Sequence, residues 1–187
     1  GYKNALAYYT YPTGSAPASD ADVDSLTIIF PNVSMTGGVG WLQNDGDLRS
    51  GDKVYLGRFP GGITLAWSLI ADGWDGGSQT VGAGNWILYS DTPINPEPDA
   101  SIRQHMVLLH DVGTDRLILG FEDIRRDSGS DNDFNDSIYF ATVNPFSSVD
   151  TTNVPDGESS RDSDGDGVMD TQDEYPNDPL RAGSTSY

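Results

Sequence analysis

The sequence predicts an all-β fold, an antiparallel β-sandwich of jelly-roll or related type. Short apolar runs recur along the chain and are separated by turn residues, including 22 glycines and 11 prolines in 187 residues. No segment carries the apolar stripe of period 3.6 that an amphipathic helix would show. Because the runs follow one another without crossover helices, they are expected to pair antiparallel and to pack as two sheets.

Seven apolar segments are expected to be strands, and the clearest of them has a period of two. In Ile63–Ala71 the side chains of Ile63, Leu65, Trp67 and Leu69 share one face. The expected strands are Ser25–Phe30, Lys53–Phe59, Ile63–Ala71, Trp86–Tyr89, His105–His110, Arg116–Phe121 and Ser137–Val143.

Two of the later segments carry a further expectation. Ser137–Val143 is apolar on both faces, so it is expected to be a central strand. Asp111–Asp115 separates two expected strands and contains a glycine, so it is expected to be a hairpin turn.

The composition changes after Phe146, and this change predicts the domain boundaries. Residues 1–146 are expected to form the β-sandwich domain. Residues 147–161 are polar and rich in Ser, Thr, Asp and Gly, as is typical of a linker. Residues 162–180 carry a dense acidic motif, and residues 181–187 are expected to form a flexible tail.

The chain is strongly acidic. It has 29 acidic residues against 10 basic ones, a formal net charge of -19. Such self-repulsion opposes folding unless bound cations neutralise it. Nucleic acid is excluded as a partner, because phosphate binding depends on Lys and Arg. There is no cysteine for disulfides or thiolate metal sites, and no apolar run approaches the roughly 20 residues that span a membrane.

The densest acidic motif is a twelve-residue loop, Asp162–Asp173. Side-chain oxygens occupy its positions 1, 3, 5, 9 and 12, with Gly167 at position 6. The donors are Asp162, Asp164, Asp166, Asp170 and Asp173, together with the carbonyl of Val168. This spacing suits Ca²⁺, because alternate carboxylates converge where glycine allows a sharp turn. The alternative is a solvated acidic linker.

The loop differs from an EF-hand in its last ligand and in its flanks. Position 12 is Asp173, which is shorter than the usual bidentate Glu, and Pro176 and Pro179 prevent a long exiting helix. The segment therefore resembles the calcium repeats of thrombospondin type III, which are structural loops rather than sensors.

A second group of oxygen donors lies between two expected strands, in residues 122–136. Asp131 and Asp133 would project to the same side of an extended chain, and Asn135 would continue the row. Oxygen donors without thiolates favour Ca²⁺ over transition metals. The alternative is a surface loop whose Asp and Asn side chains bind their own turns.

The residues of this region resemble a known family. Gly120–Asp123 followed by Asp131–Asp136 is similar to a signature of the ligand-binding domain of large bacterial RTX adhesins, and to the related domain of LruC-type surface proteins. Gly1–Tyr9, Leu69–Trp74 and Leu88–Asp91 agree with the same pattern. The resemblance implies a calcium-bound β-sandwich and a family that includes peptide-binding domains, some of which capture a chain terminus. The appended calcium repeat is a departure from the plain adhesin domain.

The resemblance also implies a set of metal ligands. By position they are Asp131, Asp133, Asn135 and Asp136. Glu122 and Asp123 are interpreted as further ligands or as groups that orient ligands, in preference to the acid pair of a glycosidase.

Asp72, Trp74 and Asp75 are candidate ligand-binding residues in a glycine-rich loop. An indole between two carboxylates suits the rim of a pocket, and the alternative is that Trp74 folds back into the core. Asp20–Asp24 and Asn44–Asp47 are further donor runs, which either hold an ion or form ordinary turns.

Catalysis is not expected. The chain has no cysteine nucleophile, no Gly-x-Ser-x-Gly motif and no phosphate-binding glycine loop with a lysine. His105 and His110 would lie on opposite faces of one strand, which disfavours a shared zinc site.

The expected function is that of a calcium-dependent extracellular binding or adhesion module that recognises a peptide or protein terminus on a cell surface. Several Ca²⁺ ions are expected as cofactors. A calcium-dependent carbohydrate-binding module and a calcium-stiffened structural spacer are the alternatives. We interpret the chain as a piece of a larger extracellular or bacterial surface protein, whose segment Arg181–Tyr187 could dock into a neighbouring copy.

Overall fold

The computed structural model describes residues 2–33, 48, 51–157, 163–164, 174–175 and 177–181. Two compact units are formed, one by Gly1–Val107 with Gly120–Ser137 and the other by Leu108–Leu119 with Ile138–Tyr187. The described residues contain strands and 3-10 turns of three residues, and no α-helix. The all-β class is therefore confirmed.

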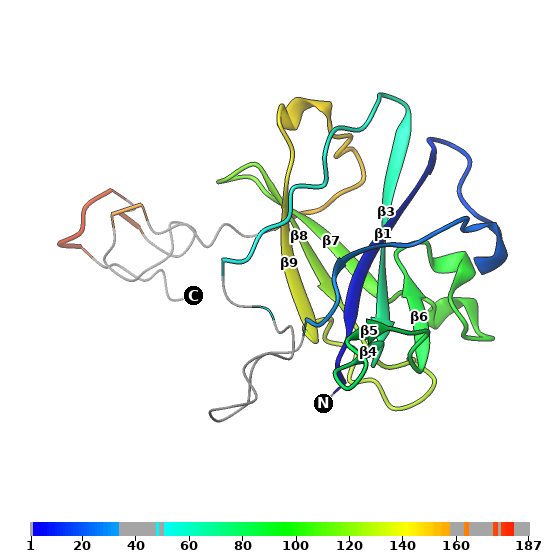
Figure 1. The fold of residues 1–187 in the computed structure, drawn as a ribbon. Coiled ribbons are helices and arrows are strands. Elements are labelled where there is room, and N and C mark those ends of the chain that lie inside the picture. Colours follow the sequence, from blue (N-terminus) through cyan, green and yellow to red (C-terminus); the bar gives the residue numbers. More distant parts are fainter. Residues whose placement is uncertain are drawn as a thin grey trace. The chain divides into compact units, whose positions relative to one another are not determined.

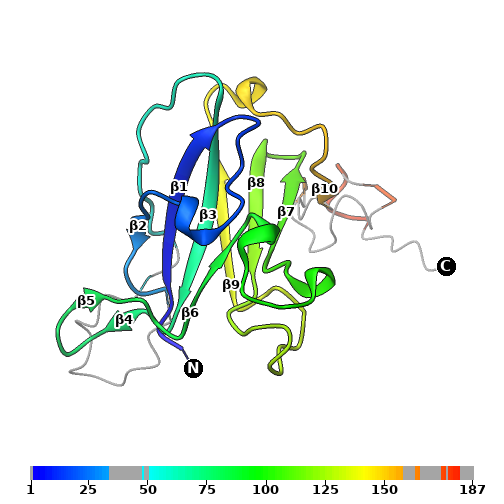
Figure 2. The same ribbon diagram turned by 90° about the vertical axis from the view of Figure 1, so that its right-hand side faces the viewer.

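The first four-stranded sheet lies within the first unit and has the order β2-β1-β3-β6 (Figures 1 and 2). Its strands are β1 (Ala5–Pro12), β2 (Thr27–Phe30), β3 (Ile63–Ala71) and β6 (Trp86–Tyr89). All three neighbouring pairs are antiparallel. The longest pairing joins β1 to β3, from Ala5 opposite Ile70 to Pro12 opposite Ile63.

Strand β1 was not among the strands expected from the sequence. Its first residues Ala5, Leu6 and Ala7 are almost fully buried, because β1 is flanked on both sides by other strands. The second half of β1 is polar and aromatic and shows no apolar alternation, so the sequence did not indicate a strand here. Its place between two neighbours depends on pairing with distant segments.

The second four-stranded sheet has the order β10-β7-β8-β9 (Figure 2). Its strands are β7 (Met106–Asp111), β8 (Arg116–Phe121), β9 (Ser137–Thr142) and β10 (Asp156–Gly157). The predicted hairpin turn joins β7 to β8, and Asp111 accepts a hydrogen bond from the N–H of Gly113 at 3.2 Å. Each sheet thus takes its strands from one half of the chain, and the two four-stranded sheets agree with the predicted β-sandwich class.

Strand β10 falls inside the segment expected to be a linker, residues 147–161. It pairs parallel with β7, with Asp156 opposite His110. The ring of His110 also stacks on Phe146, with a centroid distance of 4.8 Å. Part of this polar segment is therefore held by the second unit.

The remaining elements are short. A two-stranded sheet is formed by β4 (Trp74–Asp75) and β5 (Thr80–Val81). The 3-10 turns are η1 (Asp20–Asp22), η2 (Thr92–Ile94), η3 (Ala100–Ile102) and η4 (Phe146–Ser148). Within the described ranges, no helix has the length and apolar character needed to cross a membrane.

Two strand expectations were wrong. Ser137–Val143 was expected to be central, but β9 ends the sheet order and its residues alternate between covered and exposed. Phe140 is 57% exposed, and the Arg116 guanidinium lies over its ring at 4.6 Å, so a cation rather than a further strand contacts this apolar side chain.

Lys53–Phe59 forms no strand, because Gly57 adopts a φ of 96° that interrupts an extended chain.

Candidate metal centre

Three carboxylates from two segments of the first unit meet at one place. Glu122 follows directly after β8, whereas Asp131 and Asp133 belong to the loop that leads into β9. Each offers an oxygen, and these oxygens lie within 4.8 Å of one another. Glu122, Asp131 and Asp133 are called the acidic cluster. Among the described residues this is the group with the composition and spacing to hold a metal ion.

A tightly curved backbone brings Asp131 and Asp133 to Glu122. An extended chain was expected here, but Asn132 and Phe134 have φ values of 63° and 56°. Asn tolerates this left-handed conformation, whereas Phe rarely adopts it. Phe134 is held there because its N–H donates to Glu122 Oε2 at 3.3 Å and because the Arg126 guanidinium lies over its ring at 5.5 Å.

A glycine in β8 allows the curved loop to approach. A Cβ atom placed on Gly120 would lie 2.5 Å from the carbonyl oxygen of Phe134 and 3.1 Å from Cγ2 of Val107. No real Cβ atom can approach a backbone oxygen so closely, so only glycine fits here. The first residue of the Gly120–Asp123 motif is thus explained by the approach of the acidic loop to the strand.

Glu122 is the buried carboxyl of the cluster. Its side chain is 1% exposed. Burial raises the pKa of this carboxyl, and the charges of Asp136 and Asp131 raise it further, while hydrogen bonds from Ser130 and the Phe134 N–H lower it. A buried carboxylate beside two others is stabilised either by a proton or by a cation.

Asp123 is held by its neighbours rather than turned toward the cluster. Its carboxylate accepts from Asn4 Nδ2 at 2.7 Å, its N–H donates to Asp136 Oδ2 at 2.9 Å, and its carbonyl accepts from Trp86 Nε1 at 2.8 Å. Burial raises the pKa of Asp123, and the nearby Asp136 charge adds to the effect. These contacts hold Asp123 in place and thereby position the main chain next to Glu122.

Asn4 links this region to the predicted ligand-binding loop. It is only 4% exposed, and its Oδ1 accepts from the N–H of Asp72 at 2.9 Å while its Nδ2 binds Asp123. Asn4 was not among the residues predicted from the sequence to belong to a site. A polar residue directly before a buried apolar run was the available signal, but its partners lie 68 and 119 residues away.

A buried His–Glu pair supports the other side of the loop and was also missed. His105 and Glu97 are both fully buried, with His105 Nε2 2.8 Å from Glu97 Oε1. The carbonyl of His105 accepts from the N–H of Glu122 at 3.0 Å, and Glu97 Oε1 accepts from the N–H of Arg126 at 3.2 Å. The pair therefore fixes both the start of the acidic loop and the residues that follow.

The two histidines were expected on opposite faces of one strand, but β7 begins at Met106, so His105 precedes the strand and only His110 lies within it. His110 Nδ1 is 3.2 Å from Asp156 Oδ1, on the parallel strand β10. His105 contacts Glu97 instead. Among the described residues, neither histidine takes part in a group with metal-site spacing.

The remaining predicted ligands lie beside the acidic cluster or outside the described residues. Asp136 accepts from the N–H of Asp123, and the N–H of Asn135 donates to Asp133 Oδ1 at 3.1 Å. In the predicted calcium repeat, Asp164 is described, whereas Asp162, Asp166, Val168, Asp170 and Asp173 lie outside the described residues. Residues 182–187 of the expected tail and the donor run Asn44–Asp47 lie outside them as well.

The three predicted ligand-binding residues lie at the turn between β3 and β4 and within β4. Asp72 is exposed with a φ of 54°, and Trp74 is half-buried. Asp75 accepts from the N–H of Gly77 at 2.9 Å and from Ser78 Oγ at 2.8 Å, and the Ser78 hydrogen bond lowers its pKa. Asp75 therefore stabilises its own turn, and a ligand-binding role for the three remains a prediction.

Comparison with known proteins gives one match. The comparisons with curated proteins and with solved structures found no match to this chain. Residues 59–144, which include the whole acidic cluster, match the model of the family described as Domain of unknown function (DUF4114).

Proposed function

We propose that the chain is a calcium-dependent extracellular binding module that recognises a peptide or protein terminus on a cell surface. The acidic cluster is the observation that carries this proposal. It combines one buried and two exposed carboxylates, so a bound ion would be anchored by the fold and would still be open to an outside ligand. Its donors are all oxygens, which favour a hard cation such as Ca²⁺.

The sequence signature supports the same proposal. Gly120–Asp123 and Asp131–Asp136, which resemble the adhesin signature, supply all three residues of the acidic cluster. An extracellular or bacterial surface location would keep weak calcium sites filled. The loop Asp162–Asp173 is proposed as a further Ca²⁺ site, which would make the protein bind several ions.

Binding is favoured over catalysis because the carboxylates are engaged in holding the loop. Glu122 accepts from Phe134, and Asp123 accepts from Asn4. A pair of glycosidase carboxyls would instead have to flank an open space for the scissile bond. We therefore assign Glu122 to metal binding and Asp123 to the orientation of the loop.

The metal site can be tested by calorimetric titration of chelator-stripped protein with CaCl₂ and MgCl₂. Asp133→Asn should weaken the Ca²⁺ affinity of one site by roughly tenfold or more, because a ligand charge is lost. Asp115→Asn, at an exposed aspartate of the turn between β7 and β8 and outside every predicted donor group, should leave the affinity unchanged. Equal affinity in Asp133→Asn and the parent chain would remove the acidic cluster as a calcium site.

The ligand class can be tested by screening a peptide-terminus library and a glycan array, each with calcium and with chelator. Calcium-dependent capture of peptides is expected. Capture of glycans alone would favour the carbohydrate-binding alternative, and the absence of any ligand in both screens would favour the structural spacer. Neither of these results is compatible with the peptide-binding proposal.

A further inference from the structure

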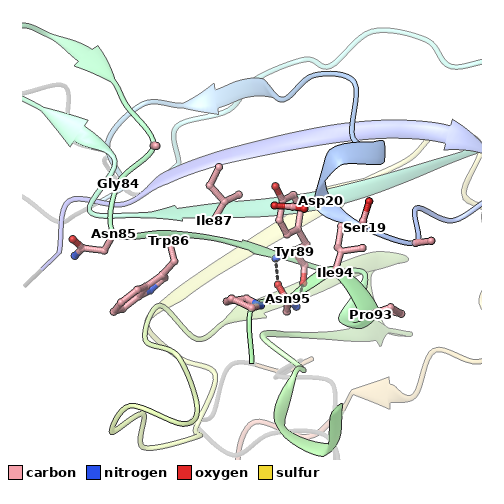
Figure 3. A pocket seen from close by; sticks show the side chains of 13 residues that line it. Ser19, Asp20, Gly84, Asn85, Trp86, Ile87, Tyr89, Pro93, Ile94 and Asn95 are labelled. Atoms are coloured by element: carbon pink, nitrogen blue, oxygen red, sulfur yellow. Dashed lines mark hydrogen bonds between the residues drawn. The ribbon is translucent and has the colours of Figure 1, made fainter. Parts of the chain in front are cut away.

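We infer that a groove along the free edge of β6 binds an extended, basic peptide segment through main-chain hydrogen bonds to Ile87. The groove has a volume of about 580 Å³ and is bounded by β6, by the loop that carries η1 and by the segment around η2 (Figure 3). The inference rests on the proposed function, in that the ligand is a peptide. It adds the site, the binding mode and the charge of that ligand.

The position of β6 makes its outer edge available. Among the described strands, β6 ends the order β2-β1-β3-β6 and pairs on one side only, with β3. An edge strand presents a row of main-chain donors and acceptors that another chain can use. In this chain the main-chain groups of Tyr89 are already hydrogen-bonded. Asn95 is 4% exposed, accepts from the N–H of Tyr89 at 2.7 Å and donates to the carbonyl of Tyr89 at 2.8 Å.

The register then identifies the residue that remains open. Tyr89 directs its N–H and C=O away from β3, toward Asn95. Because main-chain groups alternate along an antiparallel strand, Ile87 directs its N–H and C=O to the same outer edge. No other described residue pairs with these two groups of Ile87, which lines the groove. One residue of an added strand could therefore form two hydrogen bonds here.

The charge at the groove selects the occupant. The carboxylate of Asp20 lines the groove and is exposed. Its neighbour Asp22 accepts from the N–H groups of Ser19 and Ala18 at 2.8 and 3.2 Å, whereas no described residue bonds or pairs with the Asp20 side chain. The whole chain has a net charge of -19. An approaching segment that carries Lys or Arg is favoured by both the local and the overall charge.

Apolar side chains in the groove offer an extended ligand contacts in addition to the two main-chain hydrogen bonds. Trp86 and Pro93 provide apolar surface on it (Figure 3). The indole N–H of Trp86 is already used, because it donates to the carbonyl of Asp123 at 2.8 Å. The groove is therefore connected to the residue next to Glu122, so ion binding at the acidic cluster would also steady the groove.

The experiment begins with a random nonapeptide library selected on the full chain in calcium. Selected peptides should be enriched in Lys and Arg. Asp20→Asn should weaken their affinity about two- to fivefold, as for an exposed ion pair. Asp24→Asn removes an equal charge outside the groove and should change nothing. Ile87→Pro removes the outward N–H and should weaken binding about three- to tenfold, whereas Ile87→Val should bind like the parent chain.

Amide hydrogen exchange gives a readout that does not depend on a variant. The Ile87 amide should exchange fast in the free protein and slowly in the complex, even if Ile87→Pro fails to fold. Peptides that bind equally to the parent chain and to Asp20→Asn, with unchanged Ile87 exchange, would overturn the groove and leave the proposed function standing. Failure to select any peptide in calcium would overturn both.

Discussion

At the scale of single residues, the buried carboxyl of Glu122 shows why the acidic cluster could hold a cation. Its side chain accepts hydrogen bonds from the Phe134 N–H and from Ser130, and it lies beside Asp131 and Asp133. A proton or a metal ion must offset this charge, because water does not reach a carboxyl that is 1% exposed. We therefore expect protons to compete with the proposed Ca²⁺ for Glu122, and this competition can be measured.

The stability of the metal-free protein should depend on pH through Glu122. Burial raises the pKa of this carboxyl in the folded state above its ordinary value of 4.5. Between the unfolded and the folded pKa the folded chain holds more protons, so stability falls as the pH rises through this interval. In chelator-stripped protein, the free energy of unfolding of the parent chain relative to Glu122→Gln should decline as the pH rises above about 4.5. Urea unfolding at a series of pH values measures it, and a constant difference would contradict the role of Glu122.

Asn4 makes a second prediction at this scale. Asn4→Ala would leave the Asp72 N–H and the buried Asp123 carboxylate without their partner, which should cost roughly 1–3 kcal/mol in the free energy of unfolding. The exposed Asn153 provides a control, because Asn153→Ala removes an amide of the same size from the predicted linker. Equal losses in the two variants would show that the Asn4 bridge does not matter.

At the scale of elements, the loop between β8 and β9 is shaped by the strand that precedes it. The loop is curved by left-handed residues at Asn132 and Phe134, and it rests against Gly120 in β8. The buried pair of His105 and Glu97 holds the start of the same loop through main-chain groups. A strand, a loop and a buried polar pair thus cooperate to place Asp131 and Asp133 near Glu122.

The contact at Gly120 predicts the effect of one added methyl group. Gly120→Ala should push the Phe134 carbonyl away, destabilise the protein by about 1–3 kcal/mol and weaken calcium binding. Gly61 has open space around its Cβ position and no positive φ, so Gly61→Ala should be nearly neutral. Thermal unfolding and calcium titration of both variants test this. A Gly120→Ala chain with unchanged calcium affinity would show that the loop is not positioned by this contact.

At the scale of the whole molecule, the acidic charge leads us to expect that folding depends on calcium. With a net charge of -19, the acidic loops would repel one another unless bound cations offset their charge. An ion present at about 1,000 times its dissociation constant adds roughly 4 kcal/mol to stability. This is a large part of a typical total of about 5–15 kcal/mol.

Chelation should therefore lower the melting temperature markedly. Addition of CaCl₂ should restore it, whereas NaCl at equal ionic strength should restore only a small part, because screening does not replace ligation. Calorimetry of the same sample with chelator, with CaCl₂ and with NaCl makes the comparison. A melting temperature that does not respond to the chelator would contradict the calcium-dependent architecture.

Local patterns in the sequence were sufficient for the fold class and for several strands. Ile63–Ala71, Trp86–Tyr89 and Arg116–Phe121 have the predicted bounds, because alternation, apolar runs and flanking turns are local properties. Strand β1 was missed and Ser137–Val143 was misplaced, since the position of a strand within a sheet depends on pairing with distant residues. The oxygen-rich loop was recognised from its composition, which is a local property of the sequence, as is the alternation of Ile63–Ala71.

The sequence by itself determined that this is an acidic, all-β, cysteine-free chain with an oxygen-donor loop after Phe121. The tertiary structure decided which of the six predicted ligands in that loop meet, and it added Asn4, Glu97 and His105 as their support. It also placed Ile87 in β6, which ends its sheet among the described strands. Residue types and their spacing can be seen in the sequence directly. Whether the carboxylates meet depends on backbone curvature and on hydrogen bonds between residues up to 119 positions apart.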